Sequence, residues 1–278
     1  MIMLAEQVAQ ELNEAIENDQ LVLPTLPEVA LRVREAAEDP DVTSADMGKL
    51  IGNDTALTAR IIKVVNSPLL RISNEITDLH TAINRLGINY TCNLAIGLAM
   101  EQMFQATTDA VDHKMREVWA KSTEIAGISY VLCKHFTRLS PDQAALAGLV
   151  HQIGVLPILT YAEEHSSLLA NSLTLDRVIE EIHPKIGKRI LKAWDFQESI
   201  VNVPQDYLDF ERNTPKVDYA DIVQVAYLQS LSGTEHPLTK MDWTPIASFR
   251  KLGLDPSTDI KADEDLGEAL EQSKHFLQ

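Results

Sequence analysis

The chain is poor in the residues that mark several common protein classes. Its 278 residues include only two cysteines, Cys92 and Cys133, which lie far apart and form no CxxC pair. We therefore expect free, buried thiols in a reducing compartment rather than a disulfide. With only 11 glycines and 5% aromatic residues, and with Ala, Leu, Ile and Glu abundant, the composition favours helix.

Positive charge and membrane-length apolar runs are also scarce. The sequence has 24 Lys and Arg against 41 Asp and Glu, a formal charge of −17, which disfavours nucleic acid and anionic lipid as partners. The longest apolar run, AALAGLVHQIGVLPIL, is interrupted by His, Gln and Pro157, and the N-terminus turns acidic at Glu6 without a basic stretch. We predict a cytoplasmic protein with no membrane span and no signal peptide.

Helical periodicity runs through nearly the whole chain. Thr43 and Asp46 form a capping-box pattern, and Ser140-Pro141 is typical of a helix start. His183 is expected at a junction between helices, with Pro184 opening the next helix. The sequence predicts an all-α protein with a helical N-terminal subdomain over 1–110, a second helical subdomain over 111–245 and an acidic tail over 246–278. From Gly253 onward we expect a solvated helix or disorder.

The common catalytic and phosphate-binding motifs are absent. The sequence contains no GxxxxGK[ST], GxGxxG, GxSxG, HExxH or EF-hand loop. A Ser–His–Asp triad is not excluded, but no serine stands out from the others. A DNA-binding helix-turn-helix over 79–100 is disfavoured by the net charge and by the apolar segment LAIGLAM.

The histidines are the remaining candidates for chemistry. His151 and its neighbour Gln152 lie inside the longest apolar run, and a buried imidazole needs a hydrogen-bond partner or a ligand. From the residues alone, His151 is best interpreted as a core histidine bonded to a backbone carbonyl, and Trp119 and Trp194 as core anchors. The other histidines, apart from His183, lie in polar or helix-end contexts and are predicted at the surface: His80, His113, His135, His165, His236 and His275.

Several long motifs resemble those of the HDOD domain family. The first is LPTLPEVALRVREAAEDPDVTSADMGKLIGNDTALTARIIKVVNSPLL, which ITDLHTAINRLGINYTCNLAIG continues. Three later landmarks of the family are similar to VWAKSTEIAG, AALAGLVHQIGVL and HPKIGKRILKAWDF. The resemblance covers about residues 21–231 and implies an HDOD-type helical bundle, in which the N-terminal subdomain packs on a degenerate HD-like subdomain.

The resemblance also implies a former metal site. HDOD domains are related to the HD phosphohydrolases, whose histidines and aspartates hold metal ions that activate water. In this sequence the first position of that set falls at Lys121, the His-Asp pair becomes His151-Gln152, the later histidine is His183, and the last aspartate becomes Tyr227. Two neutral imidazoles without a carboxylate hold metal weakly. We therefore expect a vestigial pocket with no metal, no cofactor and no catalytic residue.

Three functions remain open at this stage. The preferred one is a non-catalytic bacterial regulatory protein, a stand-alone HDOD domain that transmits signals or acts as a scaffold by contacting other signalling proteins. The alternatives are a vestigial HD-type metal-dependent phosphohydrolase and a sensor of a nucleotide or phosphate, with Lys121, His151 and Tyr227 lining the old pocket. The sequence identifies neither the partner nor the oligomeric state.

Overall fold

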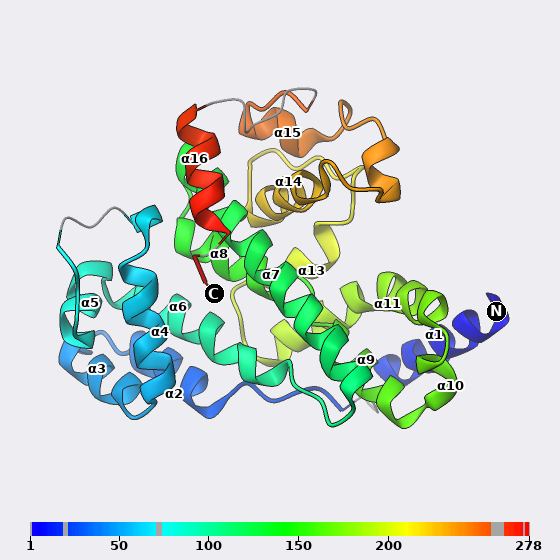
Figure 1. Cartoon of the computed structure of the whole chain (residues 1–278), viewed down its shortest axis with the longest axis horizontal. Helices are drawn as coiled ribbons and strands as arrows, with labels where there is room; N and C mark the ends of the chain where they lie inside the picture. Colours follow the sequence, from blue (N-terminus) through cyan, green and yellow to red (C-terminus); the bar gives the residue numbers. More distant parts are fainter. Residues whose placement is uncertain (1, 19–21, 71–73, 257–263, 275, 278) are drawn as a thin grey trace.

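The computed structural model describes residues 2–18, 22–70, 74–256, 264–274 and 276–277. Across these residues the regular structure is helical and no strand occurs, so the predicted all-α class is confirmed. Figure 1 shows the helices arranged as lobes around the long central helix α7 (Asp109–Phe136).

A first group of helices forms the lobe at the left of Figure 1. The predicted capping box is confirmed, because the Thr43 hydroxyl accepts from the Asp46 backbone N–H at 3.2 Å and Asp46 reaches back to the Thr43 N–H. The last helix of the group, α6, exposes only Asn89, so it offers no long free face of the kind a DNA-reading helix needs. The elements are α2 (Glu28–Glu38), α3 (Ser44–Gly52), α4 (Thr55–Val65), η1 (Pro68–Leu70), α5 (Leu79–Leu86), α6 (Ile88–Ala99) and η2 (Met100–Met103).

The second group packs around α7 and holds most of the buried polar residues. The helix predicted to start at Ser140-Pro141 does so, although the Ser140 hydroxyl bonds the Asp142 carboxylate rather than capping the backbone. Both cysteines are buried and free, as predicted, and Trp119 and Trp194 are buried. The elements after α7 are α8 (Pro141–Val150), α9 (Val155–Glu164), α10 (Ser166–Leu169), α11 (Ser172–Ala193), α12 (Glu198–Val201), α13 (Val203–Asp206), α14 (Tyr219–Leu231) and η3 (Pro237–Lys240).

Helix α11 corrects one prediction. His183 and Pro184 were expected at a junction between two helices, but α11 runs unbroken through both. Proline removes one backbone donor, which leaves the Glu180 carbonyl without its helical partner. Glu180 is exposed, so water can satisfy that carbonyl, while Ile179, His183 and Ile186 keep one face buried.

The N-terminal helix α1 (Ile2–Glu17) packs on a helix of the second group rather than on its neighbours in sequence. It lies beside α11, away from the helices α2 to α6 with which the sequence analysis grouped it (Figure 1). Val8, Ala9 and Leu12 form its buried face, and the Lys185 ammonium donates to the Asn13 side chain at 3.1 Å. Apolar burial against α11 thus decides where α1 lies.

The acidic C-terminal region is also packed rather than solvated. In α15 (Ala247–Leu252), Phe249 and Leu252 are buried, and Lys251 forms an ion pair with the buried Asp221 of α14 at 2.8 Å. Helix α16 (Glu264–Ser273) packs on α7 and buries Leu266 and Leu270. The prediction of a solvated helix or disorder from Gly253 onward is therefore wrong for α16, which is helical but packed.

One helical stretch, Pro141–Glu164, is long and apolar enough to pass a test for a membrane span. In the structure 83% of the most apolar part of this stretch is buried inside the protein. A turn at residues 151–154 divides the stretch into α8 and α9. Both features are those of a core segment.

Candidate functional site

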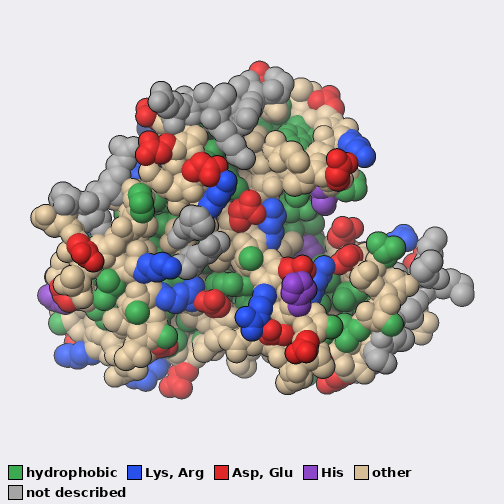
Figure 2. Space-filling view, in the orientation of Figure 1, with side chains coloured by type: hydrophobic (Ala, Val, Ile, Leu, Met, Phe, Trp, Pro, Cys, Tyr) green, Lys and Arg blue, Asp and Glu red, His purple; other side chains and the backbone are tan. Residues whose placement is uncertain are grey.

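The structure brings His151, Gln152, His183 and Tyr227 together from three helices. His151 caps the C-terminus of α8, and Gln152 follows it in the turn before α9. His183 lies on the buried face of α11, and Tyr227 lies on α14. Gln152, His183 and Tyr227 line a cavity of about 540 Å³. Figure 2 shows this face of the molecule hollowed between the part that carries α14 and the part that carries α11.

Tyr207, which the sequence analysis did not single out, completes the cluster. It caps α13, is almost fully buried, and its hydroxyl is hydrogen-bonded to His183 Nε2 at 3.2 Å. Its ring meets the ring of His151 edge-on, with centroids 4.9 Å apart and planes at 88°, and meets Tyr227 in the same way at 5.3 Å and 87°. Such perpendicular ring pairs are a favourable aromatic geometry, so the four rings form one packed unit.

The two histidines of the cluster are neutral at physiological pH. Burial lowers the pKa of His151 to about 4, and the nearby positive charge of Lys121 acts in the same direction. Burial lowers the pKa of His183 to about 3, with His151 adding to the effect. As expected, the His151 ring bonds a backbone carbonyl, with Nδ1 2.6 Å from the oxygen of Gly148. His151 Nε2 and His183 Nδ1 have no hydrogen-bond partner in the structure.

Lys121 does not enter this cavity. Its ammonium forms an ion pair with Glu124 of the same helix at 2.9 Å and lies 3.5 Å from the Ser230 carbonyl oxygen. It therefore acts on His151 through its charge, without a direct bond. His151 is completely buried and lies behind the cavity wall, so of the five residues named from the sequence only Gln152, His183 and Tyr227 line the cavity.

The remaining lining is mainly apolar, with one ion pair. Lys114 of α7 pairs with Asp176 of α11 at 2.8 Å, and Glu180 adds a second carboxylate. His236, which was predicted at the surface, is half-buried here, and its ring lies 6.5 Å from that of Tyr227. His80, His113, His135 and His165 are exposed as predicted, and His275 lies outside the described residues. The other lining residues are Val118, Val155, Ile179, Tyr207, Leu208, Phe210, Pro237 and Leu238.

The side chains present do not fit a metal centre of the HD type. Within the described residues, no group of three or more His, Cys, Asp or Glu side chains lies close enough to hold an ion. The cluster offers two imidazoles, an amide and two phenols. Burial raises the pKa of both Tyr207 and Tyr227, so their hydroxyls stay protonated and are poor ligands.

The position of Tyr207 carried no signal in the sequence. It follows a short helix in the segment VPQDYLDF, which matches no chemical motif, and it meets His183 only because α13 packs against α11. His236 was missed for a related reason, since its neighbours are polar and only the folding of η3 over α14 partly covers it. Both residues reach the site through tertiary packing.

Solved structures of known proteins share this fold. A protein of Shewanella amazonensis SB2B, provisionally assigned as a metal-dependent phosphohydrolase, is 30% identical to the chain, with a TM-score of 0.89 and 99% of each chain covered. An HDOD domain protein of unknown function from Geobacter sulfurreducens is 20% identical, with a TM-score of 0.64 and 99% of each chain covered. This second likeness shows the fold alone.

A relative is also found by sequence. An uncharacterized protein of Treponema pallidum (strain Nichols) is 25% identical in an alignment of 208 positions that covers 69% of this chain and 38% of that protein. The chain thus spans well under half of the length of this relative. The HDOD domain family itself matches residues 23–206, about the region in which the motifs resemble it. On this match, the chain belongs to the HDOD domain family.

Proposed function

We propose that this HDOD protein is a non-catalytic signal-transduction or scaffold module of the bacterial cytoplasm, which acts by binding other proteins. The observation that carries the proposal is the composition of the histidine cluster. His151 and His183 are neutral and buried, Gln152 stands where a carboxylate is needed, and Tyr207 is bonded to His183. A hydrolytic metal site requires ligands that fix the ion and an open position for water.

The test is metal content together with turnover. We expect protein purified without chelators to hold far less than one equivalent of Mn, Fe, Zn or Co by plasma mass spectrometry. With these metals added, hydrolysis of bis-p-nitrophenyl phosphate and of cyclic dinucleotides is expected to equal that of the His151→Ala variant. Stoichiometric metal, together with turnover that His151→Ala abolishes, would contradict the proposal and support a phosphohydrolase like the one assigned to the similar Shewanella protein.

A ligand sensor is the second candidate, favoured by the size of the cavity. About 540 Å³ lined by aromatic rings is enough for a small organic molecule. The charges do not favour a phosphate, because Lys114 is paired with Asp176, and Glu180 adds a carboxylate that no described cation pairs with. Thermal shift against a panel of nucleosides and the matching nucleotides tests this candidate. A nucleoside is expected to raise the melting temperature more than its nucleotide, and a panel without any shift counts against the candidate.

A further inference from the structure

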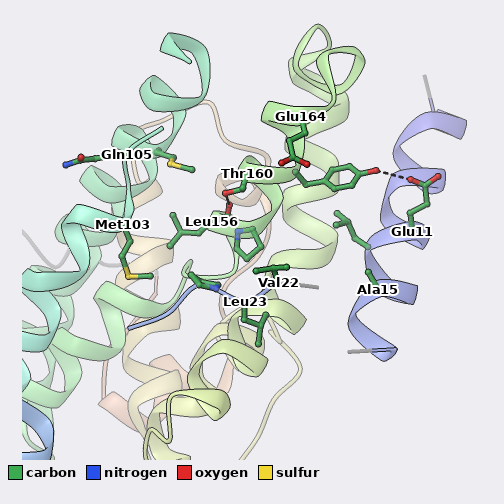
Figure 3. Close-up of a pocket in the computed structure, with 14 residues that line it drawn as sticks. Glu11, Ala15, Val22, Leu23, Met103, Gln105, Leu156, Thr160 and Glu164 are labelled. Carbon is green, nitrogen blue, oxygen red and sulfur yellow. Dashed lines mark hydrogen bonds between the residues drawn. The ribbon is translucent and has the colours of Figure 1, made fainter. Parts of the chain in front are cut away.

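A second cavity lies between α1, α9 and the segment 22–24 (Figure 3). It has a volume of about 680 Å³. Its floor is built from the buried side chains of Leu12, Met115 and Leu156. Half-buried apolar side chains form its walls, among them Leu23 and Met103. An open apolar groove of this size is unusual on a surface that is otherwise charged.

The charged residues of the groove are all acidic. Glu11 of α1 and Glu164 of α9 are both exposed at its edge, and no Lys, Arg or His is among the lining residues. Glu11 accepts a hydrogen bond from the Tyr161 hydroxyl at 3.0 Å, as Figure 3 shows. Bonds from Gln7 and Tyr161 hold the pKa of Glu11 below its usual value, so this edge keeps its negative charge at neutral pH.

The apolar part of the groove extends to an exposed residue. Val22 is 88% exposed and lines the groove beside Leu23. Within the described part of the chain no residue covers it, although a valine gains free energy when it is buried. Methionines such as Met103 and Met115 adapt to different apolar side chains and are common on surfaces that bind helices. These features match the helix-in-groove mode of recognition, in which one face of an amphipathic helix enters an apolar groove.

The charge of the whole chain argues for a basic occupant. At −17, two copies of this protein repel each other, so a second copy is a poor occupant for a groove with acidic edges. A helix that carries Lys or Arg beside its apolar face would place positive charge against Glu11 and Glu164, which gives complementarity and faster association.

We propose that the groove between α1 and α9 is the docking site for a basic amphipathic helix of a partner protein. The proposal rests on the proposed function in protein–protein signalling and names the surface and the chemistry of the partner. The apolar face of the partner helix covers Val22, Leu23 and Met103, and its Lys or Arg side chains face Glu11 and Glu164.

The probe for the test is a synthetic, fluorescein-labelled helical peptide with leucines at positions i, i+3, i+4 and i+7 and lysines on both flanks. We expect the full chain to bind it in fluorescence polarisation. The Glu164→Lys and Val22→Ser variants are each expected to bind the peptide at least about fivefold more weakly. The first replaces an attractive charge at the edge of the groove with a repulsive one, and the second removes apolar surface that the peptide would bury. Both side chains are exposed, so neither change should alter the circular dichroism spectrum.

Two controls separate docking from general attraction between opposite charges. Glu268→Lys makes the same charge change at an exposed position of α16, outside the groove, and should leave the affinity for the peptide unchanged. A peptide with glutamates in place of the lysines should not bind. Equal weakening by Glu164→Lys and Glu268→Lys, no binding at all, or a dimer that Val22→Ser dissociates in sedimentation would each overturn the inference. These outcomes leave the proposed function standing, because that function fails only through metal content and turnover.

Discussion

Tyr207 and the two histidines around it are polar side chains that are almost completely buried and have few hydrogen-bond partners among the described residues. His151, His183 and Tyr207 are each almost completely buried, and one ring nitrogen of each histidine lacks a hydrogen bond. Buried polar atoms without partners cost stability. Protonation of either histidine would also place a positive charge in this buried position. The cluster therefore makes the stability of the fold sensitive to acid, which an apolar core would not be.

The pH dependence of stability follows from the pKa values of the histidines. In the unfolded chain each has a pKa near 6.5, and in the folded protein burial lowers the values to about 4 for His151 and about 3 for His183. The unfolded state thus binds more protons below about pH 6.5. The contribution of the neutral histidines is complete above that pH and is lost as the pH falls towards the folded values. Below about pH 6, we expect the free energy of unfolding to fall by about 1 kcal/mol per pH unit for each histidine.

Urea unfolding at several pH values between about 7 and about 5 measures how steeply the free energy of unfolding changes with pH. This range lies above the pKa values of most carboxylates, so their titration contributes little. The His151→Gln and His183→Gln variants should each flatten this dependence on pH. His113→Gln, at an exposed position on α7, serves as the matched control and should keep the wild-type slope. If the wild type and the three variants all show the same slope, the pH dependence does not come from His151 and His183.

The Tyr207→Phe variant tests the hydrogen bond to His183. Removing the hydroxyl leaves the buried His183 ring without its 3.2 Å partner, so we expect a loss of about 1–3 kcal/mol in the free energy of unfolding. Tyr161→Phe is the control, because its hydroxyl bonds the exposed Glu11 and should cost about 0.5 kcal/mol or less. Urea unfolding measures both losses. If they are equal, burial does not determine how much the hydrogen bond between Tyr207 and His183 contributes to the free energy of unfolding.

At this scale the sequence singled out the two histidines that the fold buries close together, but not the tyrosine between them. His151 stood out because it interrupts an apolar run, and His183 because it was placed at a predicted helix junction and then matched the later histidine of the family. Tyr207 did not stand out, because its contact with His183 depends on how α13 packs on α11. A tyrosine in a polar segment gives no periodic or motif signal that would reveal such a contact.

At the scale of elements, the site depends on a tight crossing between the α8–α9 turn and α11. An added Cβ at Gly154 would lie 2.0 Å from the carbonyl oxygen of His183 and 2.5 Å from the backbone nitrogen of Gly187. Backbone atoms of this kind cannot move aside without shifting a helix. The absence of a side chain at Gly154 therefore lets α11 place His183 beside His151.

We predict that Gly154→Ala destabilises the protein by about 3 kcal/mol through overpacking. Gly52→Ala, at the end of α3, is the matched control, because a Cβ there would meet nothing within 4 Å and alanine favours helix. Urea unfolding compares the two, and equal stability of the two variants would contradict the proposed crossing.

Helix starts were predicted well from the sequence because caps are local, as the confirmed box at Thr43 and Asp46 shows. The course of α11 through Pro184 was not predicted, since the exposure of Glu180, which makes the proline tolerable, is a property of the fold. The packing of α16 against α7 was not predicted for a similar reason. Leu266 and Leu270 form only a narrow apolar stripe in an acidic segment. They are buried because α16 packs against α7, and the sequence of the segment alone does not show that contact.

At the scale of the whole molecule, the C-terminal segment connects parts of the chain that are far apart in sequence. Helix α16 lies so close to α7 that a Cβ on Gly127 would fall 2.4 Å from the carbonyl oxygen of Ser273. Beyond the helix, the Phe276 ring packs on Tyr130 with centroids 5.0 Å apart. Arg60 of α4 donates to the carbonyl oxygens of Leu98 and Leu277 at 3.1 and 3.2 Å. The segment thus links α7 to the lobe formed by α2 to α6.

Phe276→Ala tests whether this link stabilises the whole fold. Phe276 is 2% exposed, and truncation of a buried phenylalanine costs about 3–5 kcal/mol. We therefore expect a clearly lower melting temperature and faster hydrogen exchange at the facing positions of α4 and α7. Tyr130 loses the Phe276 ring, and Arg60 depends on the carbonyl of the adjacent Leu277, which the Phe276 ring helps to hold in place. Lys274→Ala changes an exposed residue of the same segment and should leave both measurements near wild type. Faster exchange confined to residues 264–277 would instead mean that the segment unfolds by itself, and that the lobe of α2 to α6 is held to α7 by the other helices.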